Sequence, residues 1–312
     1  DKAIHSSDLG FPAVDASCFA EDNQGAFYVG SDGHGIFKLS DDFQCLFHWK
    51  RESGLRSNNV LSFSKLQNGD LLFTTWSGGL ERLDVHSGRV TSFPFYGLEN
   101  TINSSKCVRV MRDGEVWVAI QGDGIYRRRS SGVWTKMKFV YKTYNDDWID
   151  DIEESANGIV WIVSTNGVWR YDKGDTLFFS MKSVGYDPDP YSFHDGACDA
   201  DGNFYVASNR GVVCCGADGS GMDVLDYLPK GNYASLFIDA SGMLWCSGSC
   251  GILRVNLKDS TFYSVPVKRG RQGNTYFLPR SIYRSSAGDM FFGCSDGFVV
   301  FNPDMAHRES MV

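Results

Sequence analysis

The segment GIVWIVSTNGVWRYD, residues 158–172, consists of two short apolar runs separated by a turn. The first run, 159–163, is rich in β-branched residues and contains Trp161. The dipeptide Asn166-Gly167 lies between the runs, and such a pair readily adopts the left-handed backbone conformation of a tight hairpin turn. The segment therefore predicts a β-hairpin.

This hairpin recurs along the chain. Each copy has a glycine, a large and usually aromatic residue three positions later, and a second glycine nine or ten positions after the first. The first glycines are separated by 44, 45, 44, 44, 40 and 46 residues. A repeat of this length with a glycine-aromatic strand pair is typical of β-propeller blades. The seven hairpin cores lie near 25–40, 69–84, 114–129, 158–172, 202–216, 242–256 and 288–302.

Further apolar stretches precede and follow each hairpin, as at 60–63 and 44–49. Four strands per repeat make one blade, so we predict an all-β fold over 1–312, a single seven-bladed β-propeller with four antiparallel strands per blade. The last repeat supplies only three strands. We expect residues 2–5 to pair with the last blade and close the ring, because closure removes unpaired strand edges. The aromatic position is expected to fill the seam between blades.

The chain is acidic, with a net charge of −8 and a sequence pI near 5.2. Phosphate backbones need a basic surface, so we expect no nucleic-acid partner. No run reaches the roughly 18 apolar residues of a membrane span, so we expect no membrane segment in this chain. The chain begins at Asp1 with neither Met nor a signal peptide, which suggests a mature or trimmed protein.

Nine cysteines occur without a CxxC pair, and their odd number argues against a disulfide framework or a zinc site. We expect most of them to be buried core residues, although Cys246 and Cys250 flank a predicted turn and could pair. The six histidines show no ligand spacing. We therefore expect no metal and no cofactor.

The repeat resembles the two-component regulator propeller repeat. The copies at 158–168 and 242–245 match it best, and an aspartate three residues before the glycine is found at Asp22, Asp199 and Asp239. Four copies depart from this aspartate, at Leu66, Met111, Ser155 and Ser285. The C-terminal phrase FFGCSDGFVVFNPD, 291–304, is similar to the end of the second propeller in periplasmic sensor regions of hybrid two-component regulators.

This resemblance implies a receptor of the kind found in gut Bacteroidetes. It implies two propellers outside the inner membrane, then a β-sandwich domain, a membrane helix, a histidine kinase and a DNA-binding output domain. Such receptors detect oligosaccharides and control glycan-utilisation genes. The chain would then be one periplasmic propeller of an inner-membrane receptor, with the neighbouring propeller and β-sandwich domains as partners and a homodimer as the complete receptor.

Ligand contacts are expected on the propeller face that carries the middle hairpin turns and the connections between blades. These segments are rich in aromatic, amide and cationic groups, which suit sugar rings and hydroxyls. The candidate ligand-binding residues are Arg56, Asn58, Trp76, Lys106, Gln121, Asp147, Trp148, Tyr191, His194, Arg210, Tyr233, Arg271, Tyr276 and Arg280.

Three charged segments have alternative interpretations. KRGRQGN, 268–274, could hold a uronate or sulfate through arginine, or be a solvated loop. RRRSSG, 127–132, is interpreted as an outer-edge turn that discourages strand addition. YNDDWIDDIEES, 144–155, concentrates carboxylates that calcium would favour, but it lacks the D-x-D-x-D-G loop of a dedicated calcium site.

Two other function classes remain open. One is a scaffold propeller that binds proteins or dimerises. The other is a glycan-cleaving propeller enzyme, for which 199–205 and 239–245 resemble sialidase boxes with a different aspartate spacing. A glycosidase needs two carboxylates at a fixed separation, and no nucleophile elbow or phosphate loop is present in the sequence. We expect no catalytic residues.

Overall fold

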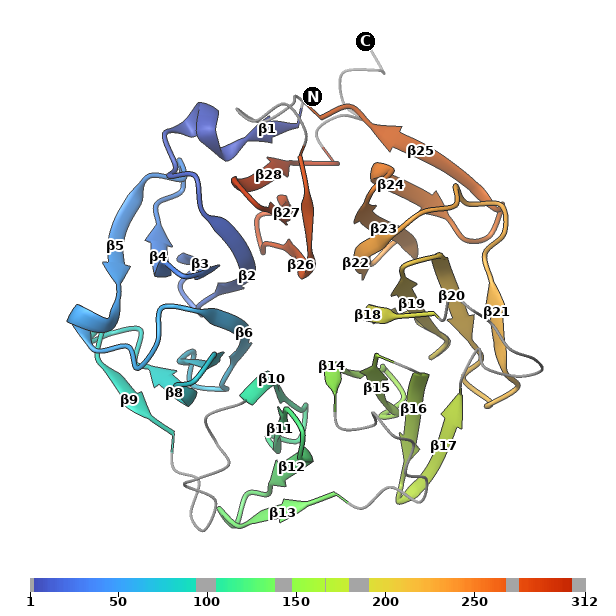
Figure 1. Ribbon diagram of the computed structural model, residues 1–312, viewed down its shortest axis with the longest axis horizontal. Helices are drawn as coiled ribbons and strands as arrows, with labels where there is room; N and C mark the ends of the chain where they lie inside the picture. The colour runs from blue at the N-terminus through green and yellow to red at the C-terminus, as the bar shows by residue number, and fades with distance from the viewer. Residues whose placement is uncertain are drawn as a thin grey trace. The chain divides into compact units, whose positions relative to one another are not determined.

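The structure is a computed structural model that describes residues 3–93, 105–137, 148–165, 167–179, 191–267 and 275–304. Over these residues the strands form seven four-stranded antiparallel sheets, which is the fold class of a seven-bladed β-propeller (Figure 1). The predicted fold class is confirmed. The chain divides into two compact units, which are described separately here: unit 1 comprises Asp1–Val110 and Val265–Val312, and unit 2 comprises Met111–Ser264.

Unit 1 contains three complete sheets. The first sheet is β2 (Asp15–Glu21), β3 (Phe27–Asp32), β4 (Gly35–Leu39) and β5 (Cys45–Trp49). The second is β6 (Val60–Lys65), β7 (Leu71–Thr75), β8 (Gly79–Leu83) and β9 (Val90–Ser92). The third has the order β1 (Ile4–His5), β28 (Gly297–Phe301), β27 (Met290–Cys294) and β26 (Phe277–Arg284). Two short 3-10 helices are η1 (Ser6–Leu9) and η2 (Arg51–Ser53).

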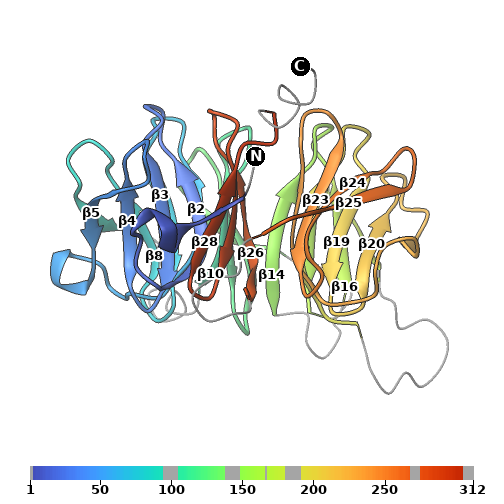
Figure 2. The ribbon, with the colours of Figure 1, turned by 90° about the horizontal axis from the view of Figure 1, so that it is seen from above.

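Unit 2 also contains three complete sheets. They are β14 (Ile149–Glu154), β15 (Val160–Ser164), β16 (Gly167–Asp172) and β17 (Asp175–Phe179); β18 (Phe193–Cys198), β19 (Phe204–Ser208), β20 (Gly211–Cys215) and β21 (Met222–Val224); and β22 (Tyr233–Ile238), β23 (Met243–Gly248), β24 (Gly251–Asn256) and β25 (Thr261–Val265). The remaining sheet is β10 (Ser105–Val110), β11 (Val116–Ile120), β12 (Gly124–Arg128) and β13 (Trp134–Lys136). Within each sheet, neighbouring strands run in opposite directions, so the turns lie at two opposite ends of the sheet (Figure 2).

The N-terminal strand completes the last sheet. Ile4 pairs with Val300 and His5 pairs with Val299, antiparallel. The expected pairing of the first residues with the last blade is therefore confirmed, and β28 is covered along this side. The β1 strand is only two residues long, so it pairs with only two residues of β28.

The repeat aspartate closes the turn between the first two strands of a blade. Oδ1 of Asp22 accepts hydrogen bonds from the backbone N–H of Gln24 at 2.9 Å and of Ala26 at 3.0 Å. Its Oδ2 accepts the hydroxyl of Tyr28, the aromatic residue of the repeat, at 3.0 Å. The aspartate thus joins the turn to the buried aromatic residue, which explains their fixed spacing.

The first glycine of each repeat has a positive φ, between 79° at Gly242 and 92° at Gly69. Only glycine adopts this conformation without strain. A side chain at Gly167, the second glycine of the quoted segment, would meet the carbonyl oxygen of Phe179 at 2.4 Å. Close approach to the outer strand β17 therefore requires a glycine here. Asn166 lies outside the described residues.

The large aromatic residues fill the space between neighbouring blades, as expected. In unit 2, Trp161 of β15 is fully buried and stacks on Phe204 of β19, with ring centroids 5.1 Å apart and planes 8° apart. In unit 1, Phe27 of β3 stacks on Phe291 of β27 at 4.0 Å. Each such contact joins two sheets, so the hydrophobic core is divided among the seams.

All nine cysteines are free, so Cys246 and Cys250 are not joined. Five of the nine are buried, which agrees with their interpretation as small core residues. Of the described residues, none belongs to a helix long and apolar enough to cross a membrane.

Candidate functional site

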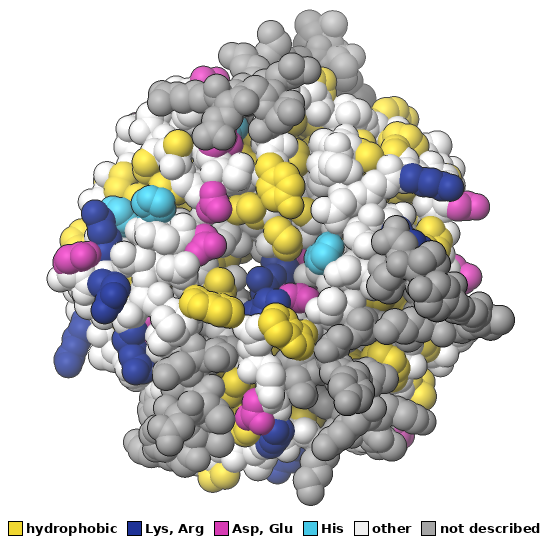
Figure 3. Space-filling model, viewed as in Figure 1, with side chains coloured by type: hydrophobic (Ala, Val, Ile, Leu, Met, Phe, Trp, Pro, Cys, Tyr) yellow, Lys and Arg dark blue, Asp and Glu magenta, His cyan; other side chains and the backbone are white. Residues whose placement is uncertain are grey.

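The unit 1 loop edge, which we define as residues 33–34, 50–59 and 76–78, is held by backbone hydrogen bonds. The N–H of Gly35 donates to the carbonyl of Asn58 at 2.8 Å, and the N–H of Trp76 donates to that of Asn59 at 2.8 Å. The turns β3–β4 and β7–β8 therefore both meet the connection between blades. Figure 3 shows Lys, Arg and His side chains over β4, β5 and η2 on this part of the surface.

Several predicted ligand-binding residues of unit 1 are accessible. The Trp76 side chain is 50% exposed and that of Tyr276 is 62% exposed, and Arg56 is also exposed. Asn58 is half-buried and its side-chain oxygen accepts the N–H of Arg51 at 2.8 Å, so it is committed to the loop.

Two further candidates of unit 1 lie in strands. Lys106 is in β10, and its carbonyl accepts the hydroxyl of Thr74 at 3.1 Å. Arg280 is in β26 with a φ of 58°, where the register shifts between Phe277 and Ile282. Both side chains are half-buried. They are less available to a ligand than the aromatic residues of the loops.

A buried carboxylate lies beneath this loop. Glu81 is 1% exposed, and its oxygens accept the N–H of Arg56 at 3.1 Å and the hydroxyl of Thr75 at 3.0 Å. Burial raises the pKa of Glu81 to about 7 despite these hydrogen bonds. A group that titrates near neutral pH therefore connects the β5–β6 loop to the β7–β8 hairpin.

The unit 2 loop edge, which we define as residues 148, 165, 191–193 and 209–210, brings three candidates into one connected segment. The N–H of Thr165 donates to the carbonyl of Trp148 at 3.2 Å, and the N–H of Phe193 donates to that of Thr165 at 3.2 Å. The Trp148 side chain is 46% exposed. The guanidinium of Arg210 lies over the Tyr191 ring, 5.3 Å from its centroid.

This pairing of Arg210 with Tyr191 positions both groups. Tyr191 also stacks on Phe193 with centroids 6.0 Å apart, and the Asn209 side chain accepts the N–H of Ser192 at 2.9 Å. The result is a half-buried platform of one cation and one aromatic ring. Such a pair can cover the C–H face of a sugar and donate to its oxygens.

Other predicted residues of unit 2 are less accessible. Tyr233 is 1% exposed, and its hydroxyl donates to the carbonyl of Pro229 at 2.8 Å, so this side chain packs in the core. Gln121 is half-buried, and its buried Oε1 has no partner among the described residues. His194 is half-buried in β18. Asp147 and Arg271 lie outside the described residues.

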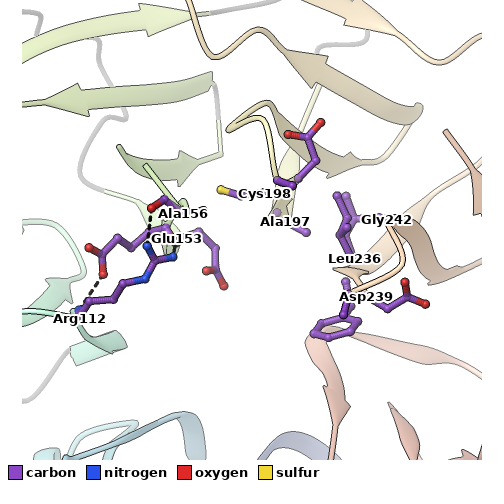
Figure 4. Close-up of a pocket in the computed structure, with 15 residues that line it drawn as sticks. Arg112, Glu153, Ala156, Ala197, Cys198, Leu236, Asp239 and Gly242 are labelled. Atoms are coloured by element: carbon purple, nitrogen blue, oxygen red, sulfur yellow. Dashed lines mark hydrogen bonds between the residues drawn. The ribbon is translucent and has the colours of Figure 1, made fainter. Parts of the chain in front are cut away.

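A cavity of about 380 Å³ lies in unit 2 at the ends of β14, β18 and β22 opposite the loop edge. None of the predicted ligand-binding residues lines it. Figure 4 shows Arg112 approaching Ala156 on one side of the cavity, with Leu236 and Asp239 on the other. Most of its lining residues come from the ends of these strands and the turns that follow them, including parts of the segments 199–205 and 239–245 compared above with sialidase boxes.

Most polar groups that line this cavity already form hydrogen bonds with other groups of the protein. Arg112 donates from Nη1 to the carbonyl of Ala156 at 2.7 Å, and its backbone N–H donates to Glu154 at 2.8 Å. The Oδ1 atoms of Asp199 and Asp239 accept N–H groups of their own turns. The cavity is therefore a hollow with fixed acceptors around an apolar floor, in the size range of small-ligand sites, about 300–1,000 Å³.

Three side chains of metal-ligating type meet in unit 1, and one of them is far from the other two in sequence. They are His5, Cys294 and Asp296, and all three are buried. Histidine spacing along the sequence could not reveal this cluster, because His5 and Asp296 are 291 positions apart.

The sequence matches no family model. It also matches no curated protein. Its fold is similar to that of the extracellular domain of BT3049 from B. thetaiotaomicron, a protein assigned as a hybrid two-component system, with 20% identity over 95% of this chain and a TM-score of 0.77. The extracellular domain of BT4673 from the same organism, also assigned as a hybrid two-component system, gives 16% identity over 92% of this chain and a TM-score of 0.72.

An enzyme has the same fold. Virginiamycin B lyase from Staphylococcus aureus gives 12% identity over 96% of this chain and 97% of its own, with a TM-score of 0.70. At these identities the likeness shows the fold alone. This chain spans 40% of the BT3049 chain and 38% of the BT4673 chain, less than half of each extracellular domain.

Proposed function

We propose that this chain is a ligand-sensing propeller of an extracytoplasmic receptor region and that it recognises an oligosaccharide. The extracellular domains of BT3049 and BT4673 support the sensory assignment through their fold. In this proposal the parent is a hybrid two-component receptor anchored in the inner membrane. Its periplasmic region contains further propeller and β-sandwich domains, it acts as a dimer, and it controls glycan-utilisation genes.

The observation that carries the ligand class is the exposure of Trp148 on the unit 2 loop edge. An indole ring that is 46% exposed gains little from the core, yet it is connected to the segment that holds Tyr191 and Arg210. Aromatic faces with a nearby cation suit pyranose rings, and anionic sugars most of all. Binding would act on signalling only if it differed between two receptor states.

Isothermal titration of the purified chain with neutral, uronic and sulfated oligosaccharides tests this proposal. We expect one class to bind and Trp148→Ala to weaken its affinity at least about tenfold, or about 1.4 kcal/mol. Tyr263→Ala is the matched control, because Tyr263 is 66% exposed on the outer strand β25, away from the loop edge. Failure of every sugar class to bind the folded chain would contradict the proposal, and so would conversion of a sugar to product.

The cavity of unit 2 offers an alternative place for the same ligand. Ala240 is an exposed lining residue, so Ala240→Trp would fill the mouth without disturbing the core. Loss of binding in this variant, with Trp148→Ala unchanged, would assign the ligand to the cavity. We expect the reverse: Trp148→Ala weakens binding, and Ala240→Trp leaves it unchanged.

A protein-interaction scaffold is the second candidate function. Its support is a group of exposed apolar side chains on outer strands: Leu46 (61%) and Phe47 (49%) on β5, and Phe262 (38%) and Tyr263 (66%) on β25. Exposed apolar edge strands promote association with other chains. Light scattering over a concentration series would show self-association that is lost in the double variant Leu46→Lys, Phe47→Lys.

A further inference from the structure

We propose that His5, Cys294 and Asp296 bind a divalent transition-metal ion of the zinc type in unit 1. His5 is the last residue of β1, Cys294 is the last residue of β27, and Asp296 lies in the turn that leads into β28. The side chains meet because β1 pairs with β28 (Figure 1). They are 1%, 0% and 4% exposed, respectively.

The distances between the ligand atoms fit a tetrahedral ion. Nε2 of His5 lies 3.6 Å from Sγ of Cys294 and 3.1 Å from Oδ1 of Asp296. All three ligand atoms lie within 4.8 Å of one another. With bonds of about 2.3 Å to sulfur and about 2.0–2.1 Å to nitrogen and oxygen, a tetrahedral ion separates sulfur from nitrogen by about 3.6 Å and nitrogen from oxygen by about 3.3 Å. The side chains need little movement to receive the ion.

Asp296 provides a second, independent observation. Its Oδ2 is buried and has no hydrogen-bond partner among the residues that the structure describes. A buried acceptor without a partner is rare because it loses its hydration without compensation. An ion bound by His5, Cys294 and Oδ1 of Asp296 would lie beside Oδ2 and would compensate the hydration that this oxygen has lost.

The other nitrogen of His5 has the surroundings of a metal-ligating histidine. Nδ1 lies 2.8 Å from Oγ of Ser7, which can accept a hydrogen bond from Nδ1–H; the Nε2 lone pair is then free to bind the ion. The rival arrangement uses the N–H of Ser7, 3.2 Å away, as donor to Nδ1. Nε2 would then carry the proton and donate to Asp296, and no ion would bind.

The donor set defines the ion class. One thiolate, one imidazole and one carboxylate favour zinc and its first-row neighbours over calcium or magnesium, which take oxygen ligands. Binding would release the thiol proton of Cys294 to solvent. The ion would join β1 to the β27–β28 hairpin, so its role is structural and independent of the proposed sugar site.

Cobalt substitution and metal analysis test the proposal. The chain is stripped with a chelator, reloaded with Co²⁺ or Zn²⁺, freed of excess ion, and measured for bound metal and for the thiolate-to-cobalt charge-transfer band. We expect one ion per chain and the charge-transfer band in the wild type. We also expect a melting temperature that falls on chelation and is restored by Zn²⁺.

Cys294→Ser and His5→Gln should each weaken metal affinity at least about tenfold, because changing even a residue that only supports a metal ligand typically weakens the affinity about 10- to 100-fold. Cys246→Ser is the matched control, because Cys246 is equally buried at 0% exposure in unit 2 and is no part of the cluster. Far-ultraviolet circular dichroism establishes that each variant is folded. A wild-type chain without the charge-transfer band would overturn the proposal whatever the variants do. A band that survives Cys294→Ser, or that disappears equally in Cys246→Ser, would also overturn it.

Discussion

The indole N–H of Trp245 donates a 2.9 Å hydrogen bond to Oδ2 of Asp239, and both side chains are buried. The same relation joins Tyr28 to Asp22 at 3.0 Å and Tyr205 to Asp199 at 3.4 Å. The repeat therefore places an acceptor six residues before an aromatic donor. In the repeat that contains residues 158–172, the aspartate is replaced by Ser155, and the buried Nε1 of Trp161 has no partner among the described residues.

The missing acceptor predicts a stabilising substitution. Ser155→Asp should accept the Trp161 N–H and the N–H groups of its own turn, as Asp239 does in its own blade. Because hydrogen bonds to charged groups contribute about 1.5–3 kcal/mol, we expect the free energy of unfolding to rise by about 1–2 kcal/mol. Urea denaturation followed by tryptophan fluorescence measures it. Ser285→Asp is the control, because its aromatic partner Phe291 has no N–H to donate; an equal gain there would refute the explanation.

Removing the acceptor in an intact blade should have the opposite effect. Burial alone would raise the pKa of Asp239, but hydrogen bonds from Ser241, Trp245 and Met243 outweigh it and hold the pKa below the ordinary 3.8. Asp239→Asn presents an amide to the indole N–H, and we expect a loss of about 2 kcal/mol at pH 7.

The pH dependence checks this assignment. Since the folded-state pKa of Asp239 is lowered, its contribution is present above the ordinary pKa and is lost as the pH falls through the lowered value. The difference between wild type and Asp239→Asn should therefore shrink below about pH 4. A difference that is constant down to pH 2 would show that the charge of Asp239 is irrelevant.

Glu81 predicts stability that falls as the pH rises. Its pKa is raised to about 7 from 4.5, so the folded state retains a proton that the unfolded state has lost between these values. The contribution is complete below pH 4.5 and is lost as the pH passes 7, by about 2–3 kcal/mol between pH 5 and 8. Chemical denaturation of wild type and Glu81→Gln at several pH values measures the difference in slope. The exposed Glu52→Gln should keep the wild-type slope, and a Glu81→Gln variant that also keeps it would disprove this origin.

Thiol reactivity should identify Cys45. It is the one exposed cysteine. Partial burial raises the pKa of Cys45 as well, but burial raises the pKa of Cys18 to about 12 and its thiol is also inaccessible. We expect one thiol per chain to react fast with Ellman's reagent under native conditions and all nine to react in denaturant. Cys45→Ser should remove the fast phase; persistence of that phase would point to one of the half-buried thiols instead.

Strand pattern and repeat length were sufficient to predict the blades, because alternation and turn chemistry are local properties. They also predicted that residues 2–5 join the last sheet. Local pattern could not separate exposed from packed aromatic residues, so Trp148 and Tyr233 were predicted alike although only the first is exposed. The cavity beside Arg112 and the cluster at His5 depend on contacts between distant segments, and no spacing along the chain encodes them.

The pairing of β1 with β28 also has a consequence for biosynthesis. Ile4 can pair with Val300, its partner in the sheet, only after the ribosome has made the 295 residues that separate them. At about 5–20 residues per second this interval lasts roughly 15–60 s, far longer than a hairpin needs to form. The blades between can therefore assemble in order of synthesis, whereas the sheet that contains β1 is completed only after Val300 has been made. A strand of two residues offers few mispairing partners during that wait.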